Sequence, residues 1–328
     1  MFDQETQMAV PGSVYLNGAC CRVGRQIAAG GEGRIYILPE NPGKVLKVLN
    51  SKYRTDTCLA HLQAIIRRNA PSEADDLAKV CLPETLAYDE NGQFIGYSMP
   101  RIRSRLMLYN LWIDPEGYFP HYDLEKRYAI AYNLAKAVGH LHRYGLVMGD
   151  INPANIVLNA NGGVTLCDLG SCSVTDPVTG VHFENGVGMV DYMAPEVYYR
   201  PLSNAEFTPQ TDSFALAILI FQIIMRGCHP FNTARKSYDE EKYSSYSFFY
   251  NTELMVGSPY FSAVDNREIP EYAKPYLAGL EPLYPLFCRV FGYDAGNVCS
   301  DGQIKGRPSP REWQEALEKL VPDRAQYF

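Results

Sequence analysis

In Val147-Met-Gly-Asp-Ile-Asn-Pro-Ala-Asn-Ile-Val-Leu158, and in Val164-Thr-Leu-Cys-Asp-Leu-Gly170 soon after it, short apolar strands flank polar turns. The turns carry Asp150, Asn155 and Asp168 at spacings that let all three side chains point into one cleft. Magnesium prefers hard oxygen ligands and takes one or two protein carboxylates with phosphate oxygens, so Asn155 and Asp168 suit it with a nucleotide between them. Asp150 then remains free to orient an attacking hydroxyl group. The pattern predicts a metal and proton-transfer site.

A glycine-rich stretch, Val23-Gly-Arg-Gln-Ile-Ala-Ala-Gly-Gly-Glu-Gly-Arg-Ile-Tyr36, precedes this region. Alternating apolar residues on both sides of the glycines indicate two strands joined by a hairpin, and a third strand follows over 43–49. A backbone without Cβ atoms can approach phosphate oxygens closely and offer its N–H groups, which suits Gly30 and Gly33 to phosphate binding. Lys47 lies on the third strand, with Val45 on the same face.

The set of motifs resembles the protein kinase family. Met148-Gly149-Asp150 and Asn155 resemble H-R-D-x-x-x-x-N, and Asp168-Leu169-Gly170 resembles D-F-G. The resemblance implies an α+β, bilobal protein-kinase-like fold with a small β-rich N-lobe and a larger, mainly helical C-lobe. It implies catalytic roles for Asp150 and Lys47 and metal binding by Asn155 and Asp168. It further implies nucleotide binding by Ala28, Gly30, Gly33, Ile35, Val45, Lys47, Met99 and Val157.

Further motifs follow in the order that the family has them. Apolar spacing predicts a core helix over 124–143. The segment 168–196 resembles an activation segment and ends in Tyr192-Met-Ala-Pro-Glu196, like the family's A-P-E. Asp212 would begin a buried helix that runs to residue 225. The resemblance also implies an ion pair between Arg307, which precedes a last helix with proline in its first turn, and Glu196.

The chain departs from the family at the expected helix over 54–68. That helix normally carries a glutamate that pairs with the strand lysine, but the only acid between residues 51 and 71 is Asp56, near the helix start. Spacing places Gln63 or His61 nearest to Lys47, so the lysine–glutamate pair is either absent or replaced.

Three more departures lie near the predicted catalytic residues. Gly149 replaces the arginine before the aspartate, and no Lys or Arg lies between residues 168 and 196, so we expect activity without a phosphate on the activation segment. Asn152 and Met189 replace a lysine and a threonine that lie near the transferred phosphoryl group in Ser/Thr kinases.

Composition limits the partners and the compartment. The net charge of −7 and the pI near 5.5 argue against a nucleic-acid-binding surface. Nine cysteines without paired C-x-x-C spacing indicate reduced thiols in a cytoplasm. The start has no secretory signal, and the apolar run 213–225 is too short to span a membrane. The aromatic tract 243–250 fits a helix with buried rings better than a partner-binding surface.

The sequence thus predicts an N-terminal extension over 1–20, a kinase N-lobe over 21–102 and a C-lobe over 103–328. The details most resemble bacterial kinase-like proteins that often carry helix-hairpin-helix modules, but no such DNA-binding module is expected here. We expect a protein kinase, of Ser/Thr type, that uses ATP with Mg²⁺ or Mn²⁺ and acts on a protein substrate. A nucleotide-binding pseudokinase scaffold and a kinase-fold nucleotidyltransferase are the alternatives.

Overall fold

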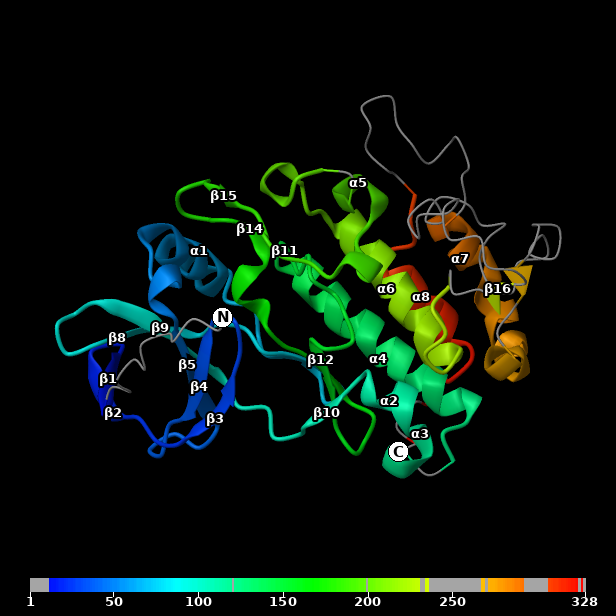
Figure 1. Cartoon of the computed structure of the whole chain (residues 1–328), viewed down its shortest axis with the longest axis horizontal. Helices are drawn as coiled ribbons and strands as arrows, with labels where there is room; N and C mark the ends of the chain where they lie inside the picture. Colours follow the sequence, from blue (N-terminus) through cyan, green and yellow to red (C-terminus); the bar gives the residue numbers. More distant parts are fainter. Residues whose placement is uncertain are drawn as a thin grey trace. The chain divides into compact units, whose positions relative to one another are not determined.

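The structure is a computed structural model, and it describes residues 12–119, 121–198, 200–230, 234–235, 267–268, 271–291, 306–323 and 326. These residues fall into two compact units. The first unit contains the described residues of Met1–Ser72, Cys81–Arg103 and Val174–Phe183, and the second contains those of Glu73–Val80, Ser104–Ser173 and Glu184–Phe328. One sheet dominates the first unit and helices dominate the second (Figure 1), so the predicted α+β class is confirmed.

The first unit is built on a seven-stranded antiparallel sheet in the order β2-β1-β8-β9-β5-β4-β3. Its strands are β1 (Ser13–Leu16), β2 (Ala19–Arg22), β3 (Gln26–Ala29), β4 (Gly33–Ile37), β5 (Lys44–Leu49), β8 (Thr85–Tyr88) and β9 (Phe94–Pro100). The predicted glycine-rich hairpin joins β3 to β4, and the predicted third strand is β5. The buried face of the sheet includes Val14, Leu46 and Ile95, whose apolar side chains form one cluster.

The beginning of the chain joins this sheet. Asn17 and Gly18, where the sequence predicts a turn, connect β1 to β2 with φ of 49° and 78°. Such left-handed dihedral angles are those that a tight two-residue hairpin needs. The boundary that we expected after residue 20 falls inside this hairpin, and Tyr15 of β1 lies opposite Tyr88 of β8. Residues 1–11 lie outside the described part.

The first unit is completed by helix α1 (Asp56–Arg67) and by a hairpin of β14 (Ser173–Thr175) and β15 (His182–Phe183). The first residue of β14, Ser173, belongs to the second unit. Thr55 caps the start of the helix, since its hydroxyl oxygen accepts a hydrogen bond from the Cys58 backbone N–H at 3.1 Å. Leu62 and Ile65 are buried. The predicted helix over 54–68 is therefore present.

The second unit holds a smaller sheet and most of the helices. The sheet has the order β10-β12-β13-β7-β6, and its strands are β6 (Glu73–Asp75), β7 (Ala78–Val80), β10 (Leu106–Met107), β12 (Ile156–Leu158) and β13 (Val164–Leu166). The sequence did not predict β6 and β7, which are three residues each. The remaining elements are β11 (Leu146–Val147), α2 (Asn110–Ile113), α3 (Pro115–Tyr118), α4 (Leu124–Arg143), α5 (Pro195–Tyr198), α6 (Pro209–Ile224), β16 (Ala234–Arg235), β17 (Arg267–Glu268), a 3-10 helix (Glu271–Leu283), α7 (Tyr284–Phe291) and α8 (Pro310–Glu318).

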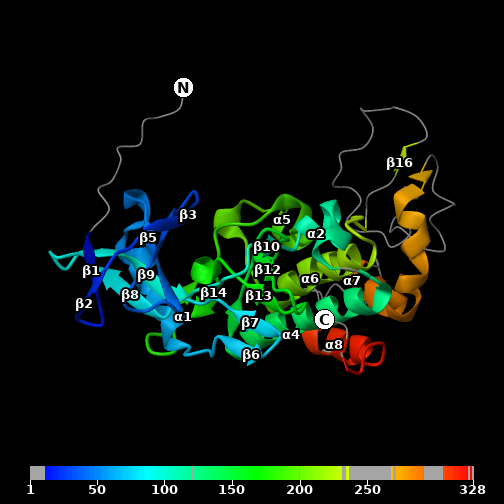
Figure 2. The same ribbon diagram turned by 90° about the horizontal axis from the view of Figure 1, so that it is seen from below.

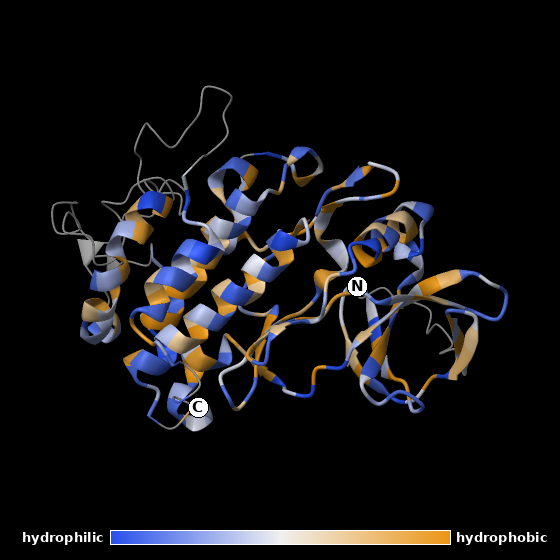
Figure 3. Cartoon of the chain, turned by 180° about the vertical axis from the view of Figure 1, so that it is seen from behind, coloured by the Kyte–Doolittle hydropathy of each residue, from blue (hydrophilic) through white to orange (hydrophobic). Residues whose placement is uncertain are grey.

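Helices α4 and α6 form the centre of the second unit, with α8 packed beside α4 (Figure 2). Asp123 caps the start of helix α4, since its carboxylate accepts a hydrogen bond from the Lys126 N–H at 3.0 Å. Aromatic rings join α7 to its neighbours: Phe287 lies 5.3 Å from Phe221 of α6 and 4.9 Å from Trp313 of α8, measured between centroids. In Figure 3 these helices carry both hydrophobic and hydrophilic residues.

Helix α6 is the buried core helix that the sequence predicts, because its residues from 211 to 224 are all buried. Among the helices that the structure describes, none is both long enough and apolar enough to cross a membrane. The aromatic tract 243–250 lies outside the described residues.

Candidate active site

The glycine-rich turn between β3 and β4 is tied to the end of β5. The Gly30 N–H donates to the Gly33 carbonyl at 2.9 Å, and the Asn50 N–H donates to the Glu32 carbonyl at 2.8 Å. A Cβ atom on Gly33 would lie 2.2 Å from the Val48 carbonyl oxygen, so only glycine allows this close approach. The turn is therefore held against the end of β5.

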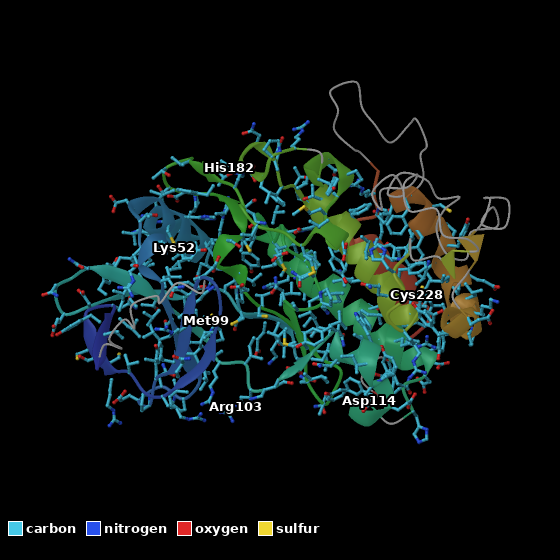
Figure 4. The ribbon with its side chains drawn as sticks, viewed as in Figure 1. Lys52, Met99, Arg103, Asp114, His182 and Cys228 are labelled. Carbon is cyan, nitrogen blue, oxygen red and sulfur yellow. The ribbon has the colours of Figure 1, made fainter. Side chains whose placement is uncertain are left out.

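Five of the predicted nucleotide-contacting residues occupy four neighbouring strands of this sheet. Ala28 of β3 lies opposite Ile35 of β4, and Ile35 lies opposite Lys47 of β5. Val45, two residues before Lys47, lies opposite Met99 of β9. Val45, Lys47 and Met99 are buried, and Figure 4 labels Met99. The first unit thus brings these five residues together.

An acidic partner of Lys47 comes from the glycine-rich turn. The Lys47 Nζ atom lies 2.6 Å from Oε2 of Glu32. We expected Gln63 or His61 to be the residue of α1 nearest to Lys47. The His61 ring stacks on Phe183 of β15, with centroids 5.1 Å apart. Spacing along the helix does not indicate Glu32, although its place between Gly31 and Gly33 is visible in the sequence.

In the second unit, three donors hold the carboxylate of Asp150. Oδ1 accepts hydrogen bonds from the Asn152 side-chain amide at 2.8 Å and from the Met189 backbone N–H at 3.0 Å. Oδ2 accepts one from the Asn155 side-chain amide at 3.0 Å. Asn152, which stands where Ser/Thr kinases have a lysine, and the backbone of Met189 therefore both orient the predicted proton acceptor.

The predicted metal ligands lie beside this carboxylate. The Cys167 N–H donates to the Asn155 carbonyl at 2.9 Å, which places Asp168 next to Asn155 at the ends of β12 and β13. Asp168 has left-handed backbone angles, with φ of 59° and ψ of 45°. Val157, the remaining predicted nucleotide contact, is buried on β12. The second unit thus brings Asp150, Asn155, Val157 and Asp168 together.

Asp212 fixes the turn that carries Asp150. Its carboxylate accepts hydrogen bonds from the N–H groups of Met148 and Gly149, each at 2.8 Å, and lies 2.9 Å from Nε2 of His142. Asp212 is 1% exposed, as expected for the buried start of α6. Burial, aided by the nearby Asp212 and Asp168 carboxylates, raises the pKa of the Cys172 thiol well above its ordinary value. That thiol therefore remains protonated and is not a nucleophile.

Comparison with known proteins agrees with this geometry, since residues 108–274 match the protein kinase domain. The chain belongs to the protein kinase domain family. It is 26% identical over 307 residues to protein kinase YegI of Escherichia coli K12, an alignment that covers 92% of this chain and 45% of YegI. It is 27% identical over 219 residues to YegI of Escherichia coli O157:H7, covering 66% and 33%.

A shorter match relates this kinase domain to the serine/threonine-protein kinase sck1 of Schizosaccharomyces pombe. The identity is 34% over 119 residues, which cover 36% of this chain and 16% of sck1. The chain spans less than half of the length of each of these three relatives.

The activation segment of this kinase domain is anchored at its start by a carboxylate. In the first unit, Oδ2 of Asp176 lies 2.6 Å from the Arg67 guanidinium of α1, and its Oδ1 accepts from the Val178 N–H at 2.9 Å. Arg68 donates to the Thr175 carbonyl. A hydrogen bond from Val178, with further bonds from Thr179 and Arg67, holds the pKa of Asp176 below its ordinary value.

The end of the activation segment is fixed by the ion pair that the resemblance implies. Arg307 donates from both terminal nitrogens to Glu196, at 2.6 and 3.0 Å, and also to the Gln210 carbonyl at 3.0 Å. Arg307 is 4% exposed. The predicted pair is confirmed, and its two parallel bonds form the geometry in which a guanidinium binds a carboxylate most strongly.

Proposed function

We propose that this chain is a protein kinase that transfers the γ-phosphoryl group of ATP to a serine or threonine hydroxyl of a protein. The observation that supports this most is the carboxylate of Asp150, which three donors hold at 2.8 to 3.0 Å in one orientation. Phosphoryl transfer needs little covalent chemistry from the protein and depends on positioning and on charge neutralisation. A fixed carboxylate meets the first of these needs.

The donor set beside Asp150 fits Mg²⁺, and Mn²⁺ as an alternative. The Asn155 amide nitrogen is used by Asp150, so its carbonyl oxygen Oδ1 and the Asp168 carboxylate are the hard oxygen donors that such ions prefer. When bound, the ion neutralises charge on the phosphate oxygens. Asn155 and Asp168 would hold it while Asp150 keeps its hydrogen bonds.

The protein groups then have separate tasks. Lys47 and the backbone N–H groups of the turn at Gly30 and Gly33 would bind the phosphates. Val45, Met99 and the apolar residues beside them would contact the base. Asp150 would accept the proton of the acceptor hydroxyl and orient its oxygen for attack.

The test compares transfer from α-labelled and γ-labelled ATP to a panel of protein acceptors and to the chain itself. Asp150→Asn removes the proton acceptor, and Asp76→Asn, at an exposed position in the turn between β6 and β7, is the matched control. We expect transfer of the γ-label only, lost in Asp150→Asn and kept in Asp76→Asn. Transfer of the α-label would indicate a nucleotidyltransferase. Binding of ATP without any transfer would indicate a pseudokinase scaffold.

A further inference from the structure

The contact between Lys47 and Glu32 lies in an environment that makes it energetically important. The lysine side chain is 8% exposed and the glutamate side chain 35% exposed, with 2.6 Å between Nζ and Oε2. An ammonium group that is almost removed from water needs an opposite charge or hydrogen-bond acceptors beside it. The Glu32 carboxylate supplies both.

The position of Glu32 is set by the sheet. The backbone of the turn is held on both sides of this residue, by the contact of Gly33 with β5 and by the hydrogen bond from the Asn50 N–H to the Glu32 carbonyl. The Asn50 side chain also donates to the Gly31 carbonyl at 3.0 Å. The carboxylate is therefore carried by a fixed piece of backbone, only a short distance from β5.

Glu32 and Lys47 both lie near Cys58 of α1. The thiol of Cys58, in the first turn of the helix, has its pKa raised by burial and by Glu32, while Lys47 acts in the opposite direction. Both charged groups are thus close to Cys58. The acid in this first turn is Asp56, which precedes Cys58 by two residues and therefore points to another side of the helix.

We propose that Glu32 is the positioning residue of Lys47 and takes the place of the glutamate that protein kinases carry on the helix. The proposal rests on the kinase function proposed above. Its consequence is that the pair joins two neighbouring parts of one sheet, so a movement of α1 would not separate the two charges. In a kinase with the usual pair, such a movement controls activity.

The experiment uses Glu32→Gln, which keeps the shape and removes the charge, and Glu40→Gln as the matched control. Glu40 belongs to the same unit, is 55% exposed and pairs with Arg22 at 3.3 Å on the surface. Glu32→Asp, which keeps the charge, tests for rescue. We expect kcat to fall roughly 10- to 100-fold in Glu32→Gln, to recover in part in Glu32→Asp, and to stay unchanged in Glu40→Gln.

A second readout does not depend on catalysis. The melting temperatures of Glu32→Gln, Lys47→Met and the double variant form a double-mutant cycle. We expect Glu32→Gln alone to lower Tm by roughly 2–4 °C and to have little further effect once Lys47 is replaced. Additive changes would show that the two groups do not interact.

The outcomes separate this inference from the proposed function. If the wild type transfers no phosphate, the kinase function is wrong, and the Tm cycle still decides whether Glu32 holds Lys47. If the wild type is active but Glu32→Gln matches Glu40→Gln in kcat and Tm, the inference is wrong. Tighter ATP binding by Glu32→Gln would also overturn it, because the carboxylate would then compete with the phosphates for Lys47.

Discussion

Gly149 shows how a single residue adapts this catalytic loop. Its φ is +72°, and a Cβ atom there would lie 2.3 Å from the Asn185 side-chain nitrogen. The arginine that kinases commonly have at this position would meet both obstacles. Asn185 of the activation segment occupies the space that such an arginine would need, and the catalytic loop keeps its shape through the hydrogen bonds to Asp212.

We expect Gly149→Ala to lower the free energy of unfolding more than Gly180→Ala does. Gly180 has a similar φ of +74° but open space around its missing Cβ atom, so it carries only the cost of a left-handed alanine, about 1–2 kcal/mol. Gly149→Ala adds the collision with Asn185. Urea unfolding of both variants measures the difference, and equal losses would show that the Asn185 side chain moves aside.

Several side-chain contacts join helix α1 to the β14–β15 hairpin. The ion pair of Arg67 with Asp176, the hydrogen bond from Arg68 and the stacking of His61 on Phe183 connect them along the helix. The segment that a phosphate orders in many kinases is here anchored by a carboxylate.

The pH dependence of this element follows from Asp176. Its folded-state pKa is lower than the unfolded value of about 3.9, so its contribution is present at neutral pH and is lost as the pH falls through the folded-state pKa. We expect the hydrogen-exchange protection of the hairpin to be unchanged down to about pH 4 and to decrease below it. Asp176→Asn should lack this acid transition, and a transition that persists in the variant would assign it elsewhere.

We expect phosphatase treatment to leave kinase activity unchanged. The activation segment, 168–196, contains the Ser and Thr residues Ser171, Ser173, Thr175 and Thr179. Ser173 is 1% exposed and donates to Glu184 at 2.9 Å, so a kinase cannot reach it in the folded state. The matched variant therefore replaces the other three with alanine and leaves Ser173 in place. A loss of most activity in both samples, with unchanged ATP affinity, would show that a phosphate is required.

At the scale of the whole molecule, Arg307, which precedes α8, connects that part of the chain to the activation segment through its ion pair with Glu196. We expect Arg307→Lys to lower the free energy of unfolding by about 3 kcal/mol, because a lysine cannot form the two parallel bonds and leaves the Glu196 carboxylate poorly paired. Arg311→Lys is the control, since Arg311 is exposed and pairs with Glu315 on the surface. A similar loss in both variants would contradict a special role of Arg307.

Much of this architecture was predictable because it depends on local patterns. The apolar spacing from 124 to 143 defines α4 to the residue, and the alternation around the glycines defines β3, β4 and β5. The strands β6 and β7 were missed because three residues carry too little periodicity. The pairing of Lys47 with Glu32 was missed for another reason: it depends on how a turn folds back over a strand, and spacing in the sequence does not report that distance.

The Arg307–Glu196 pair also has a consequence for the synthesis of the chain. The two residues are 111 positions apart, and a ribosome adds about 5–20 residues per second, so Glu196 is made roughly 5 to 20 s before its partner. During that interval the activation segment and the start of α6 lack one of their anchors. Nascent chains stalled before residue 307 should therefore be cleaved near residue 196 by a protease that spares the released protein.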